Sequence, residues 1–311
     1  MGGEAMRVGY DRPLYILAFD HRSSFEELAA KAGVPESERA AKISEAKRVI
    51  FEGFMVAVDR GAPRDAAGIL VDEQYGADVA RAARERGYIL AMPVEKSGQK
   101  VFDFEYGEQF GEHILAFDPT FSKVLVRYNP DDSPETKRIQ LERLKRLHDW
   151  LRERERRFLL ELLVPATKEQ LEAVGGDSER YDREVRPELT LQAIDEFYAA
   201  DIVPDIWKIE GLDRREDCER MGAKVRSGGR DAVSCVVLGR GADAARVDHW
   251  LRMAAGVPGY VGFAIGRTLW WDGVQGYLNG TLTREVAAEK IAANYLRAID
   301  LYVSAARASV A

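Results

Sequence analysis

Short apolar runs and longer amphipathic stretches alternate along the whole chain. Eight apolar runs have the length of β-strands and fall at residues 14–19, 68–71, 88–92, 123–128, 158–163, 205–209, 233–238 and 260–265. Between them, apolar residues recur every three or four positions, as at Ile139, Leu141, Leu144, Leu147 and Leu151. This spacing predicts helices at 38–59, 76–86, 133–156, 189–199, 214–227 and 242–255, and a last one at 283–303.

Strands that alternate with helices predict a parallel sheet with right-handed crossovers. Eight such units fit a closed (β/α)8 TIM barrel, and an open doubly wound sheet is the alternative. The connection at 97–122, before the fourth strand, is long and rich in phenylalanine, so we expect a loop that holds a short extra helix or a lid. Because the sequence has no internal repeat and no linker-like tract, we expect one barrel domain over residues 1–311 with a C-terminal helix.

Composition and charge exclude several classes of protein. Hydrophobic residues make up 46% of the chain and charged residues 31%, which is typical of a folded globular protein. The 45 basic and 52 acidic residues are interspersed and give a net charge of −7, so we expect no nucleic-acid partner. No apolar run approaches about 18 residues, so we expect no membrane span. Cys218 and Cys235 lack metal-ligand spacing and the N-terminus lacks a secretory pattern, which predicts a reducing, cytoplasmic location.

A lysine stands where a buried strand should carry an apolar residue. Lys208 lies in the run PDIWKIEG, and lysine is rarely buried without a partner. Residues two apart share a face of a strand, so Glu210 is expected to point the same way. Two other predicted strands bring Lys123 and Glu161. A low-dielectric site beside a second cation favours the neutral amine that attacks a carbonyl group, and a carboxylate can move the protons. A structural ion pair is the alternative.

Polar residues and glycines also follow most of the other predicted strands. In a (β/α)8 barrel the active site forms at the carboxyl ends of the strands, so these residues are candidate substrate ligands. The glycine-rich turns and the arginine after the last two strands offer N–H donors that suit a phosphate group. The candidates are Asp20, Arg22, Asp72, Glu95, Lys96, Arg127, Glu210, Gly239, Arg240, Gly266 and Arg267.

Metal-binding and structural roles are the alternatives for these residues. The histidines show no paired-ligand spacing, so no zinc site is expected. Lys123 could reach solvent at the amino end of the barrel, and Asp20 could pair with Arg22. A magnesium ion would use the carboxylates at the strand ends, Asp72, Glu95, Glu161 and Glu210.

Seven short motifs resemble a known family. In order, over about residues 14–275, they read FDHR, ILVDEQYG, PVEKSG, KVLVRY, FLLELL, WKIEG and GRTLWW. This ordered set is similar to the class I (Schiff base) aldolases of the tagatose 1,6-bisphosphate aldolase type. It looks closest to the subgroup found as the carboxyl-terminal half of some 5-dehydro-2-deoxygluconokinases of inositol catabolism.

The resemblance implies a (β/α)8 barrel and catalytic roles for four residues. It implies that Lys208 forms the Schiff base and that Lys123 is the family's lysine on strand four. Glu161 matches the acid/base glutamate on strand five, and Asp20 matches the aspartate after strand one. No cofactor or metal is implied.

The phosphate end matches the family in part. The family's phosphate-binding Gly-Arg pair falls on Gly266 and Arg267. Where the tagatose-type enzymes carry a serine at the turn after strand seven, this chain has Gly239, followed by Arg240. Phosphate contact at this turn is therefore expected from the backbone or from Arg240.

We therefore expect a retro-aldol lyase that acts on a small phosphorylated keto sugar or keto sugar acid. The subgroup implies 2-deoxy-5-keto-gluconate 6-phosphate, which is split to dihydroxyacetone phosphate and malonate semialdehyde. The alternatives are a magnesium-dependent barrel lyase or isomerase and a non-catalytic sugar-phosphate-binding protein. The sequence is compatible with a homo-oligomer.

Overall fold

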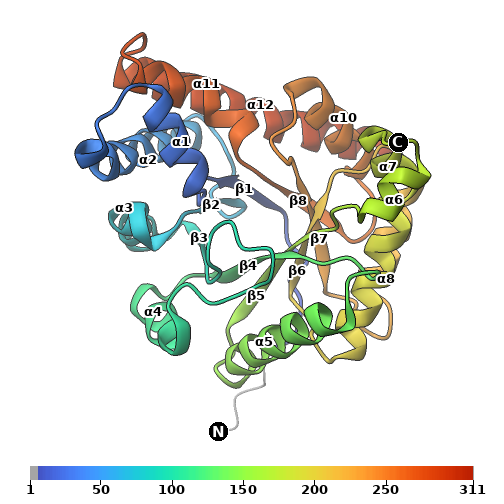
Figure 1. Cartoon of the computed structure of the whole chain (residues 1–311). Helices are drawn as coiled ribbons and strands as arrows, with labels where there is room; N and C mark the ends of the chain where they lie inside the picture. The colour runs from blue at the N-terminus through green and yellow to red at the C-terminus, as the bar shows by residue number, and fades with distance from the viewer. Residues whose placement is uncertain (1–5, 311) are drawn as a thin grey trace, which may run out of the picture.

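Eight parallel strands close into a barrel in the computed structural model, which describes residues 6–310 (Figure 1). The strands follow chain order around the barrel, and β1 pairs with β8 to close it. Their bounds are β1 (Leu14–Ala18), β2 (Ala67–Leu70), β3 (Ile89–Pro93), β4 (Phe121–Arg127), β5 (Arg157–Leu163), β6 (Ile206–Glu210), β7 (Ser234–Leu238) and β8 (Tyr260–Ile265). Each overlaps one predicted run. The predicted (β/α)8 barrel is confirmed, and the open doubly wound sheet is excluded.

Helices connect the strands and surround the barrel (Figure 1). The seven predicted helices correspond to α2 (Glu36–Asp59), α3 (Glu73–Glu85), α5 (Pro134–Glu153), α8 (Arg186–Ala199), α9 (Arg215–Val225), α10 (Ala244–Ala254) and α12 (Arg284–Val310). The periodicity missed α1 (Ser23–Lys31), α4 (Phe110–Phe117), α6 (Lys168–Ala173), α7 (Ser178–Glu184) and α11 (Arg267–Leu278). Four of these five have nine residues or fewer, which is too short for a helical period to be evident.

The connection before β4 holds the extra helix that its length suggested. A 3₁₀ turn, η1 (Gly107–Gln109), leads into α4, and Glu95 forms an isolated antiparallel bridge with Phe104. Phe104 stacks on Phe110 with ring centroids 4.5 Å apart and contacts Phe102 edge-on at 5.1 Å. The phenylalanines of this segment therefore form a local core that anchors the connection.

The interior of the barrel changes from apolar to charged along the strands. Phe121, Leu159 and Ile206 belong to an apolar cluster inside the barrel. Because alternate residues of a strand share a face, the residues two positions further along also face inward. On β4, β5 and β6 these residues are Lys123, Glu161 and Lys208. A charged layer therefore lies on the apolar layer, toward the carboxyl ends of the strands.

The N-terminal segment closes the other end of the barrel. The ring of Tyr10 contacts Phe121 edge-on, with centroids 5.1 Å apart. The backbone N–H of Gly9 donates to the buried carboxylate of Asp205 at 2.7 Å, and Arg152 pairs with that carboxylate at 2.8 Å. With the amino end closed, the charged layer is reached from the carboxyl end.

The C-terminal helix α12 was predicted and packs along α2 and α11 (Figure 1). No helix within residues 6–310 is long and apolar enough to cross a membrane. The domain predicted over 1–311 includes residues 1–5 and 311, which lie outside the described residues.

Candidate active site

A cavity of about 300 Å³, open to solvent, lies at the carboxyl ends of the strands. Two of the fourteen predicted site residues, Asp72 and Glu210, do not line it. His21, in the loop after β1, lines it in addition. The structure brings the other twelve together there: Asp20, Arg22, Glu95, Lys96, Lys123, Arg127, Glu161, Lys208, Gly239, Arg240, Gly266 and Arg267.

A carboxylate lies between two ammonium groups at the centre of this site. Lys208 Nζ is 3.2 Å from Oε1 of Glu161, and Lys123 Nζ is 3.3 Å from Oε2 of the same carboxylate. All three side chains are buried. Each ammonium group thus contacts a different oxygen of the carboxylate, and Glu161 bridges the two lysines. Such pairing is required, because an unpaired buried charge would cost several kcal/mol of desolvation.

Lys123 has two further carboxylate partners. Its Nζ lies 2.8 Å from Oδ2 of Asp20 and 2.5 Å from Oε1 of Glu95. Arg22 supports Glu95, with Nη1 donating to its backbone oxygen at 2.9 Å and Nη2 lying 3.6 Å from its carboxylate. Among residues 6–310, Lys123 therefore contacts three carboxylates, whereas Lys208 contacts one. This difference distinguishes the two lysines chemically.

Burial and neighbouring charges set the protonation of this cluster. Burial alone would lower the pKa of Lys123, but Asp20, Glu95 and Glu161 outweigh it and raise that pKa above its ordinary value. Burial would raise the pKa of Glu161, yet Lys208 and Lys123 lower it. For Glu95 burial wins, and its pKa is raised despite the nearby Lys123. Near neutral pH, Lys123 is therefore protonated and Glu161 is ionised.

The ends of β7 and β8 form a cationic part of the cavity. A Cβ atom at Gly266 would lie 2.4 Å from the carbonyl oxygen of Ala18. Gly241 has a φ of 67°, and a Cβ atom there would lie 2.6 Å from the guanidinium of Arg267. Both positions therefore need glycine. Nε of Arg267 is buried without a hydrogen-bond partner in the described part of the chain, at the amino end of α11, where helix N–H groups favour an anion.

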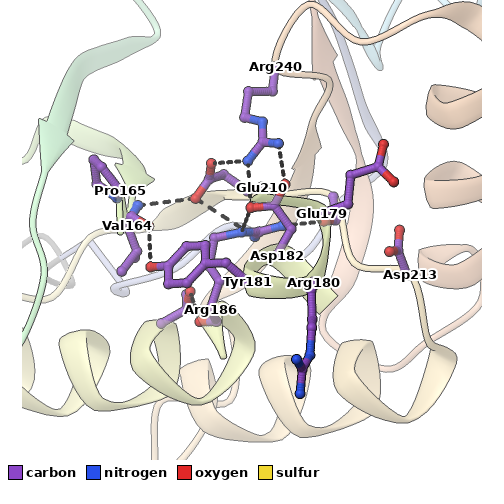
Figure 2. Close-up of polar contacts among 12 residues, drawn as sticks. Val164, Pro165, Glu179, Arg180, Tyr181, Asp182, Arg186, Glu210, Asp213 and Arg240 are labelled. Atoms are coloured by element: carbon purple, nitrogen blue, oxygen red, sulfur yellow. Dashed lines mark hydrogen bonds and ion pairs between the residues drawn. The ribbon is translucent and has the colours of Figure 1, made fainter. Parts of the chain in front are cut away.

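Arg240 lines the cavity, but its guanidinium points into a network of ion pairs with α7 and β6 (Figure 2). Its Nη1 lies 3.2 Å from Oδ1 of Asp182 and 3.1 Å from Oε1 of Glu210. Arg186 completes the network, with Nε 3.3 Å from the same oxygen of Asp182 and Nη1 3.7 Å from Glu210. Two arginines and two carboxylates thus neutralise one another. Both Arg240 and Glu210 are thus ion-paired within the protein. The substrate contacts predicted for these two residues stay predictions.

A buried lysine that the sequence analysis missed binds Asp72. Lys47 of α2 has no exposed surface and contacts Oδ1 of Asp72. Its Nζ also donates to the backbone oxygens of Phe19 at 2.7 Å and of His21 at 2.8 Å. These two carbonyl groups flank Asp20, so Lys47 fixes the loop that carries this aspartate. Asp72 is therefore the ion-pair partner of Lys47 and does not line the cavity.

Lys96 and Arg127 line the cavity on the side of β3 and β4. Nη1 of Arg127 donates to the backbone oxygen of Gln99 at 2.8 Å, which holds the guanidinium over the connection before β4. In an eight-stranded barrel, β3 and β4 lie opposite β7 and β8. The cavity therefore carries cationic side chains on two opposite sides.

The described residues contain no group of three or more His, Cys, Asp or Glu side chains that could hold a metal ion. The carboxylates considered for magnesium face lysines or arginines of the protein itself. These carboxylates are Asp72, Glu95, Glu161 and Glu210.

Replacing Lys123 with methionine should destabilise the protein, and more so as the pH rises. Without the ammonium group, Asp20, Glu95 and Glu161 face one another, which raises their pKa values in the folded state. The folded variant then binds more protons than the unfolded chain, so its stability falls with rising pH. We expect the free energy of unfolding, measured by urea titration, to drop by about 3–5 kcal/mol at pH 7 and by less at pH 5.

The matched control for this prediction is Lys145→Met, which removes a partly exposed lysine paired with Asp149. Its effect should stay within about 0.5 kcal/mol at either pH. In the wild type, the raised pKa of Lys123 keeps its contribution intact at all pH values below the ordinary lysine range. An equal loss of stability at pH 5 and pH 7 in Lys123→Met would contradict the electrostatic origin of the effect.

Comparison with known proteins places this barrel in context. A solved fructose-bisphosphate aldolase from Plasmodium falciparum, in a ternary complex with TRAP and a small-molecule inhibitor, matches with a TM-score of 0.65. The match covers 96% of this chain and 92% of that chain at 11% sequence identity, so the two proteins share a fold. No curated protein matches the sequence. A family model described as "Uncharacterized protein conserved in bacteria (DUF2090)" matches residues 5–306, and the chain belongs to this family.

Proposed function

We propose that this protein is a class I aldolase that cleaves a phosphorylated keto sugar or keto sugar acid through an imine on Lys208. The observation that carries the proposal is the carboxylate of Glu161, which contacts Lys208 and Lys123 at once in the charged layer above the apolar part of the barrel interior. Nucleophilic catalysis by an amine needs such a base within hydrogen-bond distance. The barrel shared with fructose-bisphosphate aldolase and the motif resemblance support the same reaction class.

The contrast between the two lysines assigns the nucleophile. Lys123 contacts three carboxylates, which hold it in its protonated form and leave no lone pair for attack. Lys208 contacts Glu161 alone among the described carboxylates. Lys208 is therefore the amine that attacks the ketone, and Lys123 is the fixed cation.

Imine formation follows from this arrangement. The neutral Nζ of Lys208 bonds to the carbonyl carbon and forms a carbinolamine. Glu161, 3.2 Å from Nζ, first accepts a proton from the ammonium group of Lys208 and, after the attack, gives it to the former carbonyl oxygen. It then takes a second proton from the nitrogen and passes it to the carbinolamine hydroxyl group, which leaves as water. The product is a protonated imine, which carries the positive charge that the next step requires.

Carbon–carbon cleavage uses the same carboxylate. Glu161 takes the proton from the hydroxyl group on the far carbon of the bond that breaks, and its lowered pKa keeps it in the ionised form required. The electrons of the broken bond move into the protonated imine and give an enamine, while the hydroxyl-bearing fragment leaves as an aldehyde. Protonation of the enamine carbon and hydrolysis of the imine release the ketone and restore Lys208.

The distribution of cations supports a substrate with an anionic group at each end. Arg267 and the amino end of α11 lie on one side of the cavity, and Lys96 and Arg127 lie on the other. The proposed substrate, 2-deoxy-5-keto-gluconate 6-phosphate, has a phosphate near its ketone and a carboxylate at its far end. Imine formation at its ketone and cleavage of the next bond but one would give dihydroxyacetone phosphate and malonate semialdehyde.

Borohydride should trap the product ketone on the protein. Incubation with dihydroxyacetone phosphate and then sodium borohydride reduces the imine to a stable amine, so the chain gains the mass of the reduced adduct. Peptide mass spectrometry should place the adduct on Lys208. Lys208→Met should form no adduct and show a loss of cleavage activity of at least about 10³-fold, since the covalent route is gone.

Lys145→Met, at a partly exposed lysine outside the cavity, is the control and should trap the ketone like the wild type. An adduct on Lys123, or an unmodified Lys208 at saturating ligand, would refute the assignment. Activity that EDTA abolishes and borohydride leaves intact would instead support a magnesium-dependent lyase. Binding with thermal stabilisation and no turnover would support a non-catalytic binding protein.

Glu161→Gln should separate proton transfer from substrate binding. The amide keeps the shape of the side chain but accepts no proton, so we expect kcat to fall by about 10²–10⁴-fold while KM changes little. Steady-state kinetics against Glu142→Gln, an exposed substitution on α5, provides the comparison. A kcat within threefold of the wild type would exclude Glu161 as the acid/base group.

A further inference from the structure

The imidazole of His21 lines the cavity but has no assigned role. His21 follows Asp20 in the loop after β1, and its ring packs edge-on against Trp270 with centroids 5.6 Å apart. Its Nδ1 is buried and has no hydrogen-bond partner in the described part of the chain. A Cβ atom at Gly266 would lie 2.9 Å from the Cε1 atom of the ring, so this glycine makes room for the imidazole.

The surroundings of Nδ1 decide which ring nitrogen carries the proton. A neutral imidazole has one N–H donor and one acceptor nitrogen. A buried N–H without an acceptor is among the costliest orphaned groups, whereas an unprotonated nitrogen without a donor costs less. The proton therefore belongs on Nε2, the other polar atom of a ring that faces the cavity. His21 thus offers one donor to whatever occupies the cavity.

The ring is neutral throughout the physiological range. Burial lowers the pKa of His21 to about 3 together with the positive charges of Arg267, Lys208 and Lys47, although Asp20 opposes this shift. His21 is therefore an uncharged donor, and it exchanges no proton with the substrate near neutral pH.

The residues around His21 indicate that its ring would contact an anionic group of a bound ligand. Arg267 directly follows Gly266, the glycine that makes room for the ring, and lines the same cavity. Its Nε is also buried without a partner among the described residues. Arg240, the other arginine of this region, is occupied by Asp182 and Glu210 (Figure 2). Arg267, His21 and the amino end of α11 can therefore donate to an anion at this end of the cavity.

We propose that His21 is a substrate-binding residue that donates a hydrogen bond from Nε2 to an oxygen of the anion held by Arg267. The ligand class is a phosphate monoester, or free inorganic phosphate. The inference rests on the proposed function in one respect, because that function supplies the phosphate ester. The orphaned Nδ1 and the position of the ring beside Arg267 carry it independently of any turnover.

The tautomer can be observed directly. In ¹⁵N-labelled wild-type protein, two-bond ¹H–¹⁵N correlation spectra should show the Nε2–H tautomer for His21 from pH 6 to pH 9. His21→Asn assigns the resonance by its disappearance. A protonated Nδ1, or a ring that titrates within this range, would overturn the proposal.

Two amide substitutions separate the donor from the ring. The amide nitrogen of glutamine can reach the position of Nε2, whereas that of asparagine reaches only the position of Nδ1. Calorimetric titration with inorganic phosphate should give a Kd roughly 10- to 100-fold higher for His21→Asn, as expected when a hydrogen bond to a charged group is lost. His21→Gln should stay within about fivefold of the wild type. His249→Asn, at an exposed histidine on α10, is the control and should leave the Kd unchanged.

Borohydride trapping with two ketones distinguishes the failure of this inference from the failure of the proposed function. His21→Asn should need more dihydroxyacetone phosphate than the wild type for half-maximal adduct, but the same amount of unphosphorylated dihydroxyacetone. If no protein forms an adduct and His21→Asn still weakens phosphate binding, the proposed aldolase activity fails and the role of His21 stands. If adducts form and phosphate binds equally to all variants, the role of His21 is refuted.

Discussion

The contact of one carboxylate with two buried ammonium groups is the interaction on which the site depends. Glu161 lies between Lys208 and Lys123, with each nitrogen within 3.3 Å of a different oxygen. Glu161 is paired in register with Lys208 of β6. Lys123 of β4 is paired with Leu159, two residues before Glu161, and its side chain reaches the carboxylate from there. Their opposite charges compensate one another inside the barrel, and removal of any one of the three side chains leaves an excess buried charge.

The charges around this contact are balanced. Adding Asp20, Glu95 and Arg22 gives three cations and three carboxylates within the same buried cluster. In the proposed reaction Lys208 loses its proton and then regains a positive charge as the imine. Because Lys123 stays protonated throughout, Glu161 keeps a cationic partner at each stage. In the proposed mechanism, the constant charge of Lys123 therefore stabilises Glu161 while the charge of Lys208 changes.

Much of the fold and part of the site follow from local sequence patterns. The strands are buried runs of four to seven residues between helical stretches, so their number and order could be predicted. Lys208 was evident because a charge stood within such a run. Lys47 could have been found in the same way, because it lies on the face of α2 that buries Ile43 and Ile50. It was missed because buried charges were sought in the predicted strands and not in the helices.

The contacts that the sequence could not predict join segments that are distant along the chain. The alternation of strand faces placed Glu210 beside Lys208, yet Glu210 is the last residue of β6 and its carboxylate pairs with Arg240 and Arg186. Asp182 belongs to α7, a helix too short to show a period, so its pairing with Arg240 left no local trace. Such long-range pairings depend on the conformations of the loops in the folded protein, and these conformations cannot be predicted from the spacing of residues along the chain.

A crystal structure of the protein reduced with borohydride in the presence of dihydroxyacetone phosphate would show which residue forms the imine. We expect continuous density from Nζ of Lys208 to the former carbonyl carbon, with Glu161 beside the new bond and the phosphate against Arg267. Density joined to another lysine, or an unmodified Lys208 with the ligand bound non-covalently, would contradict this expectation.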